Sequence, residues 1–275
     1  MIKISMRLEE DLIKEVDEYV DYFTIKNRSQ AIKFLLKTAL DEKKVAVILA
    51  KGRDVAGADL EKDLKINDDE YNITAKIKNT TLIEEQLKYL RKYNFNTIYI
   101  VYPKKIIQNI QEIIGNQPKA DIKFFEIKNK DMTADALKIL KGKIHSNFLM
   151  IYGDVISNMN LENIYIQHVK SNSACTMMVT SSKMPSEKGS VKIEGNKIIG
   201  FEEKTKVQEN FIVSEPIYIM GPEIFDIKGK SLPYDIFPEL AKKNILGAHL
   251  SSSDIVHLHE EKDKKNIVEF LNNNT

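Results

Sequence analysis

The chain is poor in cysteine, with a single one, Cys175, among 275 residues. An internal disulfide and a zinc site built from cysteines are therefore excluded, and a reduced protein inside the cell is the simplest interpretation. The chain also lacks an excess of charge of one sign, because 41 Lys and Arg residues stand against 40 Asp and Glu residues. Any contact with nucleic acid must consequently come from a local basic patch.

Long apolar runs are scarce too. The chain has no stretch of about 18 uncharged apolar residues, and its first residues alternate in character where a signal peptide would be continuously apolar. We therefore expect no membrane association and a cytoplasmic protein. A hydrophobic content of 43% in 275 residues is enough for more than one core, so we expect two domains, residues 1–44 and residues 45–275.

The N-terminal segment has the pattern of a small strand-helix-helix unit. Residues 2–8 alternate between apolar and polar side chains, which predicts a strand. The polar face of this strand consists of Lys3, Ser5 and Arg7. Apolar residues at helical spacing predict a helix over about residues 9–22, and Ser29 is a typical N-cap for a second helix. So short a segment cannot bury enough apolar surface alone, and we expect a homodimer or a larger oligomer.

This segment resembles the ribbon-helix-helix repressors of bacteria and archaea in its strand, its acidic helix start and its Arg28-Ser29 pair. The resemblance implies double-stranded DNA as a partner, with a two-stranded ribbon in the major groove. Lys3, Ser5 and Arg7 would then contact bases, while Arg28 and the amide of Ser29 would hold phosphate. The alternatives are that Lys3 and Arg7 form only the solvated side of an edge strand, or that the unit serves only for dimerisation.

The rest of the chain alternates between strand and helix patterns. Apolar runs predict strands at residues 45–49, 97–101, 122–125, 148–151 and 174–179. Helical spacing predicts helices at residues 82–93, 104–114, 133–140, 161–169 and about 261–271. A hairpin is expected around Gly195. Such alternation predicts an α/β fold with a mostly parallel, mixed sheet covered by helices, and with ligands at the carboxyl ends of the strands.

Several short motifs follow one another in this region. They are Val47–Ala50, Thr81–Leu87, Thr133–Leu137, Tyr152–Val155, Gly200–Lys204 and Ile217–Ile219. In their order they resemble the motifs of sugar-phosphate nucleotidyltransferases, and the resemblance implies a Rossmann-like sheet, a nucleotide or sugar-phosphate ligand and Mg²⁺. The residues that it assigns to the ligand are Gly52, Arg53, Thr133, Ala134, Gly153, Asp154, Glu203 and Lys204. Asp154 would also be the metal ligand and, in an active enzyme, the catalytic residue.

The chain departs from the family pattern at four positions. They are Asp54 for the second glycine of the phosphate loop, Asn72 for a lysine, Met132 for a glycine beside the base, and His257 for the second metal carboxylate. A carboxylate in the loop would repel phosphate, and imidazole is a poor ligand for Mg²⁺. Lys65 or Lys76 could replace the missing lysine only in a shifted alignment.

Two interpretations of the whole chain follow. The leading one is a DNA-binding transcriptional regulator whose large domain is a degenerate nucleotidyltransferase that binds a ligand or sets the oligomeric state. The alternative is an active enzyme that carries the DNA-binding module and converts a nucleoside triphosphate and a sugar 1-phosphate into a nucleotide sugar and pyrophosphate. His257 and His259 lie two residues apart and could hold a transition metal, or could be ordinary strand residues.

Overall fold

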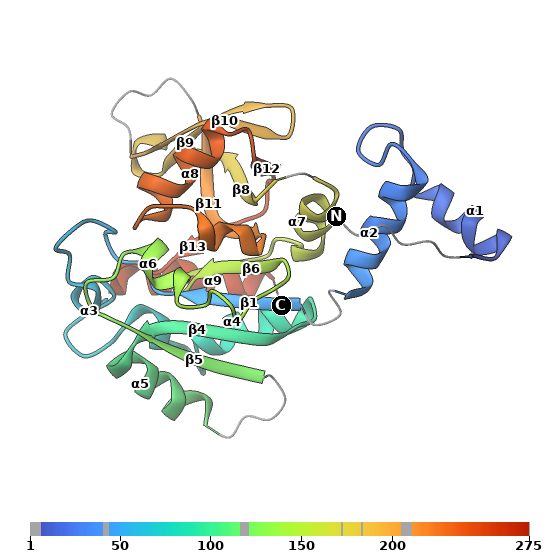
Figure 1. The fold of residues 1–275 in the computed structure, drawn as a ribbon. Helices are drawn as coiled ribbons and strands as arrows, with labels where there is room; N and C mark the ends of the chain where they lie inside the picture. The colour runs from blue at the N-terminus through green and yellow to red at the C-terminus, as the bar shows by residue number, and fades with distance from the viewer. Residues whose placement is uncertain are drawn as a thin grey trace.

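The computed structural model describes residues 7–40, 44–115, 121–171, 173–182, 184–204 and 211–274. The main strands are β1 Lys44–Leu49, β4 Phe95–Pro103, β5 Asp121–Ile127, β6 Phe148–Tyr152, β8 Cys175–Ser181, β9 Gly189–Glu194, β10 Lys197–Glu203, β11 Ile212–Met220 and β12 Leu246–Leu250. Over these described ranges they form one nine-stranded sheet, in the spatial order β5-β4-β1-β6-β11-β8-β12-β10-β9 (Figure 1). The predicted α/β fold with a mixed sheet is confirmed.

The first half of the sheet is parallel. β1 lies between β4 and β6, with Val47 paired to Tyr99 on one side and to Met150 on the other. These strands are continuous apolar runs because helices and loops cover both faces of a parallel sheet. β11 then runs antiparallel to β6 and to β8, and the sheet ends in the hairpin of β9 and β10. The carboxyl ends of β1 and β6 therefore open at the same edge.

Helices connect and cover the strands. The longer ones in the sheet domain are α4 Leu82–Lys92, α5 Lys104–Ile114, α7 Leu161–Lys170 and α9 Lys264–Asn273, and the shorter ones are α3 Leu60–Asp63, α6 Thr133–Lys138 and α8 Phe237–Lys242. α5 packs against β4 and β5, while α7 packs against β8, β11 and β12. Thr81 and Glu84 form a capping box that starts α4, as their spacing in the sequence allows. None of the described helices is long and apolar enough to cross a membrane.

Small elements complete the edge near the carboxyl ends. The short strands are β2 Lys76–Ile77, β3 Thr80–Thr81, β7 Val155–Ser157 and β13 Ile255–His257. The single turns are the 3-10 helices η1 Asn72–Thr74, η2 Pro185–Glu187, η3 Pro222–Asp226 and η5 Glu261–Asp263, and the π-helical turn η4 Leu232–Ile236. β13 pairs antiparallel with β7, which sets His257 opposite Val155. The terminal helix begins at Lys264 rather than at the expected residue 261, because residues 261–263 form η5.

The N-terminal segment contains α1 Glu10–Glu18 and α2 Arg28–Leu40, which stand at one side of the sheet domain with α2 against α7 (Figure 1). α1 is shorter than expected because the Asp21 carboxylate accepts the amides of residues 23–25 and closes a turn there. Most of the predicted strand lies outside the described residues, and Arg7 and Leu8 have irregular backbone. The ribbon-helix-helix assignment is therefore not shown. The domain boundary at residue 44 and the homodimer stay predictions.

Candidate functional site

A cavity of about 500 Å³ lies at the carboxyl ends of β1 and β6. Volumes of this order are typical of small-molecule sites. The loop after β1 contributes Lys51, Gly52 and Arg53, and the turn after β6 contributes Asp154. The other walls come from η2 and the start of β9, from the ends of β10 and β11, and from β13 and the residues that follow it.

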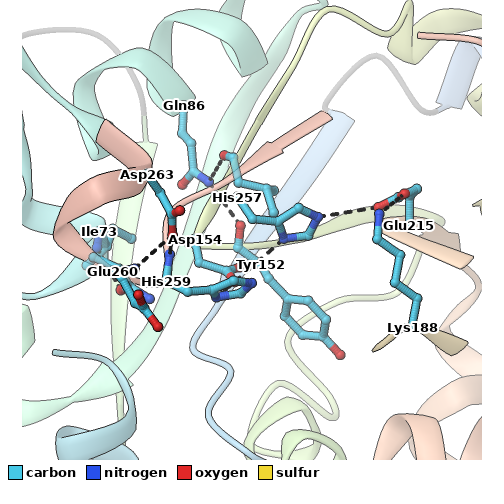
Figure 2. A network of polar contacts seen from close by, with 12 residues as sticks. Ile73, Gln86, Tyr152, Asp154, Lys188, Glu215, His257, His259, Glu260 and Asp263 are labelled. Atoms are coloured by element: carbon cyan, nitrogen blue, oxygen red, sulfur yellow. Dashed lines mark hydrogen bonds and ion pairs between the residues drawn. The ribbon is translucent and has the colours of Figure 1, made fainter. Parts of the chain in front are cut away.

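Three hydrogen bonds hold the turn that presents Asp154. Gly153 N donates to Leu49 O at 3.1 Å, which ties the turn to the end of β1. The buried Gln86 amide donates to the carbonyls of Tyr152 and Val155, at 2.9 Å and 2.7 Å (Figure 2). Because Gln86 belongs to α4, the helix fixes the strand ends on both sides of Asp154.

The Asp154 side chain is buried at the bottom of the cavity and faces two histidines. Its Oδ2 lies 3.4 Å from His259 Nδ1 and 3.9 Å from His257 Nδ1. On its other side, His257 Nε2 lies 3.4 Å from Glu215 Oε2, and Lys188 donates to the second oxygen of Glu215. Figure 2 shows these residues in a row, from His259 through His257 to Lys188. We call Asp154, His257, His259, Glu215 and Lys188 the acid-histidine cluster.

Charges within the acid-histidine cluster stabilise one another. Burial raises the pKa of the Asp154 carboxyl, but the neighbouring His257, with His259 and Lys51, outweighs it and holds the pKa below its ordinary value. Burial likewise raises the pKa of Glu215, and the hydrogen bonds from His257 and Lys188 outweigh it. For His257, burial lowers the pKa, and the two carboxylates raise it above its ordinary value. Both acids are therefore ionised at neutral pH.

The loop after β1 brings two cationic side chains to the cavity. Lys51 Nζ lies 4.7 Å from the centre of the Tyr152 ring, on the cavity wall. The Arg53 guanidinium pairs with Asp63 at 2.9 Å, and the second oxygen of Asp63 accepts the Arg53 amide, also at 2.9 Å. This loop thus binds a carboxylate through its backbone and its arginine, which is the chemistry that phosphate would use.

Asp54 does not have the role expected for a carboxylate in this loop. Its side chain is buried and accepts the amide and hydroxyl of Thr133, at 2.6 Å and 2.7 Å, and the hydroxyl of Ser231. Its φ of 56° is in the left-handed region, which Asp tolerates better than most residues. Both carboxylate oxygens are engaged with α6 and with the N-cap of η4, and Asp54 does not line the large cavity, so the expected repulsion of phosphate stays a prediction.

The predicted ligand residues fall into two groups. Those that line the large cavity are Gly52, Arg53, Asp154, Glu203, Lys204 and His257. Thr133 and Ala134 lie buried at the start of α6, where the Ala134 amide donates to Lys230 O at 2.8 Å. Thr133 and Met132 border a second, much smaller cavity of about 10 Å³. Gly153 lies beneath Asp154 and acts through the backbone.

Of the residues expected to bind DNA, the structure describes Arg7, Arg28 and Ser29. Lys3 and Ser5 lie outside the described residues, and Arg7 is exposed. The Arg28 guanidinium donates two hydrogen bonds to Asp17, at 2.7 Å and 2.6 Å. The prediction that Arg28 holds phosphate stays untested, and in this structure its donors are directed at a carboxylate within the same segment. Ser29 lies in the first turn of α2, next to Arg28.

The sequence analysis did not single out three cavity residues, Lys51, Lys188 and Glu215. Their signal is weak because each comes from a different loop or strand with no common spacing. The position expected to carry a lysine holds Asn72, which is buried and accepts the amide of Ile73 at 2.7 Å. Lys65 donates to the carbonyl of Asp68. Lys51 is consequently a better source of the missing charge than Lys65.

The family model described as nucleotidyl transferase matches residues 73–254. The chain belongs to this family. The regulator interpretation is wrong, since the family and the relatives below support the alternative, a sugar-phosphate nucleotidyltransferase, and DNA as a partner is withdrawn with it.

Curated relatives agree with the family. The chain is 31% identical over 160 residues to the bifunctional protein GlmU of Methanococcus aeolicus. The aligned region covers 51% of this chain and 38% of that protein. It is 30% identical over 125 residues to a probable mannose-1-phosphate guanylyltransferase of Oryza sativa subsp. japonica. That aligned region covers 42% of this chain and 35% of that protein. The matches thus span less than two fifths of each relative's length.

Solved structures share the fold over most of the chain. A glucose-1-phosphate thymidylyltransferase from Bacillus anthracis, titled as putative and solved with a sucrose, has a TM-score of 0.69 at 16% identity and covers 82% of this chain and 94% of its own. HddC from Yersinia pseudotuberculosis has a TM-score of 0.66 at 18% identity and covers 83% of this chain and 99% of its own. At such identities these likenesses show the fold.

The family resemblance implies Mg²⁺, whose preferred ligands in proteins are oxygen atoms in octahedral arrangement. At the candidate metal site, Asp154 supplies one carboxylate, and the imidazoles of His257 and His259 supply the other candidate ligands. This donor set does not fit Mg²⁺. We therefore assign no step of the reaction to that ion.

Proposed function

We propose that the chain is an active sugar-phosphate nucleotidyltransferase. In this reaction an oxygen of a sugar 1-phosphate bonds to the α-phosphorus of a nucleoside triphosphate. The bond from that phosphorus to the bridging oxygen breaks, and pyrophosphate leaves with the electron pair. The observation that carries the proposal is the single cavity in which the loop after β1, Asp154 and the Glu203-Lys204 pair meet.

Phosphate binding is the first task that the cavity can perform. The loop after β1 offers the Arg53 amide and guanidinium, which in this structure hold Asp63. A phosphate that displaced the Asp63 carboxylate would meet the same donors. Lys51 and Lys204 add positive charge on the cavity wall. Cations placed where charge develops on the phosphates stabilise the transition state and the leaving pyrophosphate.

Sugar binding is the second task, and the end of β10 brings groups for it to the cavity. The half-buried Glu203 is a hydrogen-bond acceptor for sugar hydroxyls, next to Lys204. Gly189 lies beside it, and a Cβ there would lie 2.9 Å from a Glu203 carboxylate oxygen and 2.6 Å from the Phe201 ring. The absence of a side chain at Gly189 therefore keeps this wall open.

Pyrophosphate release tests the proposal. Purified protein is mixed with pairs of one nucleoside triphosphate and one sugar 1-phosphate, in the presence of each of several divalent ions. The panel includes GTP with mannose 1-phosphate, because one relative is named a mannose-1-phosphate guanylyltransferase. We expect release with at least one pair, and a large loss of kcat/KM in Lys51→Ala and in Glu203→Gln. Lys105→Ala, which changes an exposed lysine at the start of α5, is the matched control.

Two results would overturn the proposal. Absence of pyrophosphate release across the whole panel, from protein shown to be folded, would remove the claim of activity. Equal kcat/KM values for Lys51→Ala and Lys105→Ala would show that the reaction, if present, takes place elsewhere.

A further inference from the structure

Two histidines face Asp154 because side chains alternate between the two sides of the chain along residues 257–259. Side chains two residues apart in an extended chain point to the same side. Between His257 and His259, Leu258 points the other way and is completely buried among residues of α9, β2 and β7. Its amide also donates to Asp154 O at 2.7 Å. The anchored leucine thus directs both imidazoles toward the cavity and the aspartate.

The geometry points to a site for a divalent transition-metal ion, bound by Asp154, His257 and His259. The three candidate ligand atoms all lie within 4.8 Å of one another. Ligand atoms about 2.1 Å from a tetrahedral ion lie roughly 3.4 Å apart. The distance from Asp154 Oδ2 to His259 Nδ1 is 3.4 Å, and the distance to His257 Nδ1 is 3.9 Å. A shift of about half an ångström would bring His257 Nδ1 to that distance from Asp154 Oδ2.

Unpartnered buried atoms support this assignment. Within the described residues, Asp154 Oδ1 and His257 Nδ1 are both shielded from solvent and have no hydrogen-bond partner. Leaving such atoms without a partner costs free energy, so native structures usually satisfy them with protein, water or an ion. Both atoms belong to the same small cluster, and a cation bound by Asp154 Oδ2 would give His257 Nδ1 the partner that it lacks.

Glu215 supplies the second half of the arrangement. A metal-bound histidine commonly donates its other ring N–H to a carboxylate, which orients the ring and makes the bound nitrogen more basic. His257 Nε2 lies 3.4 Å from Glu215 Oε2, and Glu215 is in turn held by Lys188. If Nε2 carries the hydrogen, Nδ1 has its lone pair free toward Asp154. Glu215 and Lys188 are therefore positioning residues for His257.

The donor set also selects among ions. Imidazole nitrogen suits Zn²⁺, Co²⁺ and Ni²⁺, whereas Mg²⁺ requires oxygen ligands and keeps its waters. One carboxylate and two imidazoles leave at least one position open for a water or a phosphate oxygen. This inference rests on the proposed function as regards the reaction that the ion would serve, because the open position faces the same cavity. It concerns only which ion binds.

Co²⁺ is the probe, since its visible absorption reports imidazole coordination directly. The full-length protein is stripped with a chelator, dialysed against Co²⁺ without substrate, and its metal content and spectrum are measured. We expect one equivalent of bound Co²⁺ with visible absorption bands that a large excess of Mg²⁺ does not remove. His259→Ala should abolish these bands, and Glu215→Gln should weaken Co²⁺ affinity by about 10- to 100-fold.

The controls separate metal binding from folding and from catalysis. His259 is largely exposed, so His259→Ala and His259→Gln should keep the circular dichroism spectrum of the unchanged protein. His145→Ala removes another exposed histidine and should leave the Co²⁺ bands intact. Bands that persist in His259→Ala, or displacement of Co²⁺ by Mg²⁺ at equal concentration, would overturn the inference. Metal binding without pyrophosphate release would refute only the proposed function, and turnover without Co²⁺ binding would refute only this inference.

Discussion

Gly153 is the residue whose replacement the structure constrains most directly. A Cβ at this position would lie 1.7 Å from the hydroxyl oxygen of Tyr102 and 2.8 Å from Cδ1 of Ile73. Tyr102 is completely buried in β4 and cannot swing into solvent. Overpacking of a dense core costs about 1–3 kcal/mol, and a contact this short predicts a value near 3 kcal/mol for Gly153→Ala. Asp154, the next residue, would be displaced as well, so pyrophosphate release should fall.

Urea denaturation measures this cost, with Gly200→Ala as the matched control. A Cβ at Gly200 would meet Lys192 at 3.5 Å, which is ordinary van der Waals contact. This substitution should therefore leave the free energy of unfolding within about 1 kcal/mol of the original. Tyr102→Phe removes the clashing oxygen, and it should recover part of the loss when combined with Gly153→Ala. Equal midpoints for Gly153→Ala and Gly200→Ala, or no recovery in the double variant, would refute the reasoning.

Three further predictions concern other contacts. Asp54→Ala removes the buried acceptor of Thr133 and should lower the free energy of unfolding, measured in urea, by about 2–4 kcal/mol. Asp54→Asn should lower it less, and equal losses for the two variants would contradict this prediction. Gln86→Leu leaves two buried carbonyls without donors, so we expect a loss of about 2 kcal/mol by thermal unfolding, and an unchanged midpoint would argue against the bracing role. Arg28→Met should raise the pKa of Asp17 toward its ordinary 3.8, because the hydrogen bond and charge of Arg28 lower it. The contribution of that ion pair is present above pH 3.8 and is lost as the pH falls through the lowered pKa, so a carboxyl NMR titration unmoved by the substitution would exclude the pair in solution.

Local patterns in the sequence were enough for most of the sheet domain. The apolar runs at β1 and β6 and the helical spacing at α4 and α5 predict these elements with nearly the bounds observed. Such patterns record burial, on one face of a helix and on both faces of these strands, which each segment's own residues show. β7 and β13 are too short to have a pattern, since each exists only because the other pairs with it. β12 was also missed, because Gly247 and His249 interrupt its apolar character.

The acid-histidine cluster was harder to foresee, because its members are far apart in the chain. Asp154 and His257 could be suspected from the order of motifs alone. Glu215 and Lys188 could not, since they meet only when β11 is placed beside the start of β9. The N-terminal segment is a different case, because there a close resemblance in sequence is not matched by a finding in the structure. Its residue order resembles a known family closely, yet Arg28 is engaged by Asp17, and the family finding concerns residues 73–254.

The departures from the family pattern differ in weight according to where each side chain lies. Asp54 and Asn72 are buried and hydrogen-bonded inside the domain, so they change the packing behind the cavity and leave its walls as they are. His257, in contrast, faces Asp154 and changes the donor atoms offered to an ion. A sequence alignment counts each of these substitutions equally, as the loss of a residue of the family pattern. The structure separates them: the first kind is compatible with phosphate binding by Lys51 and the Arg53 amide, and only the second kind alters the chemistry of the site.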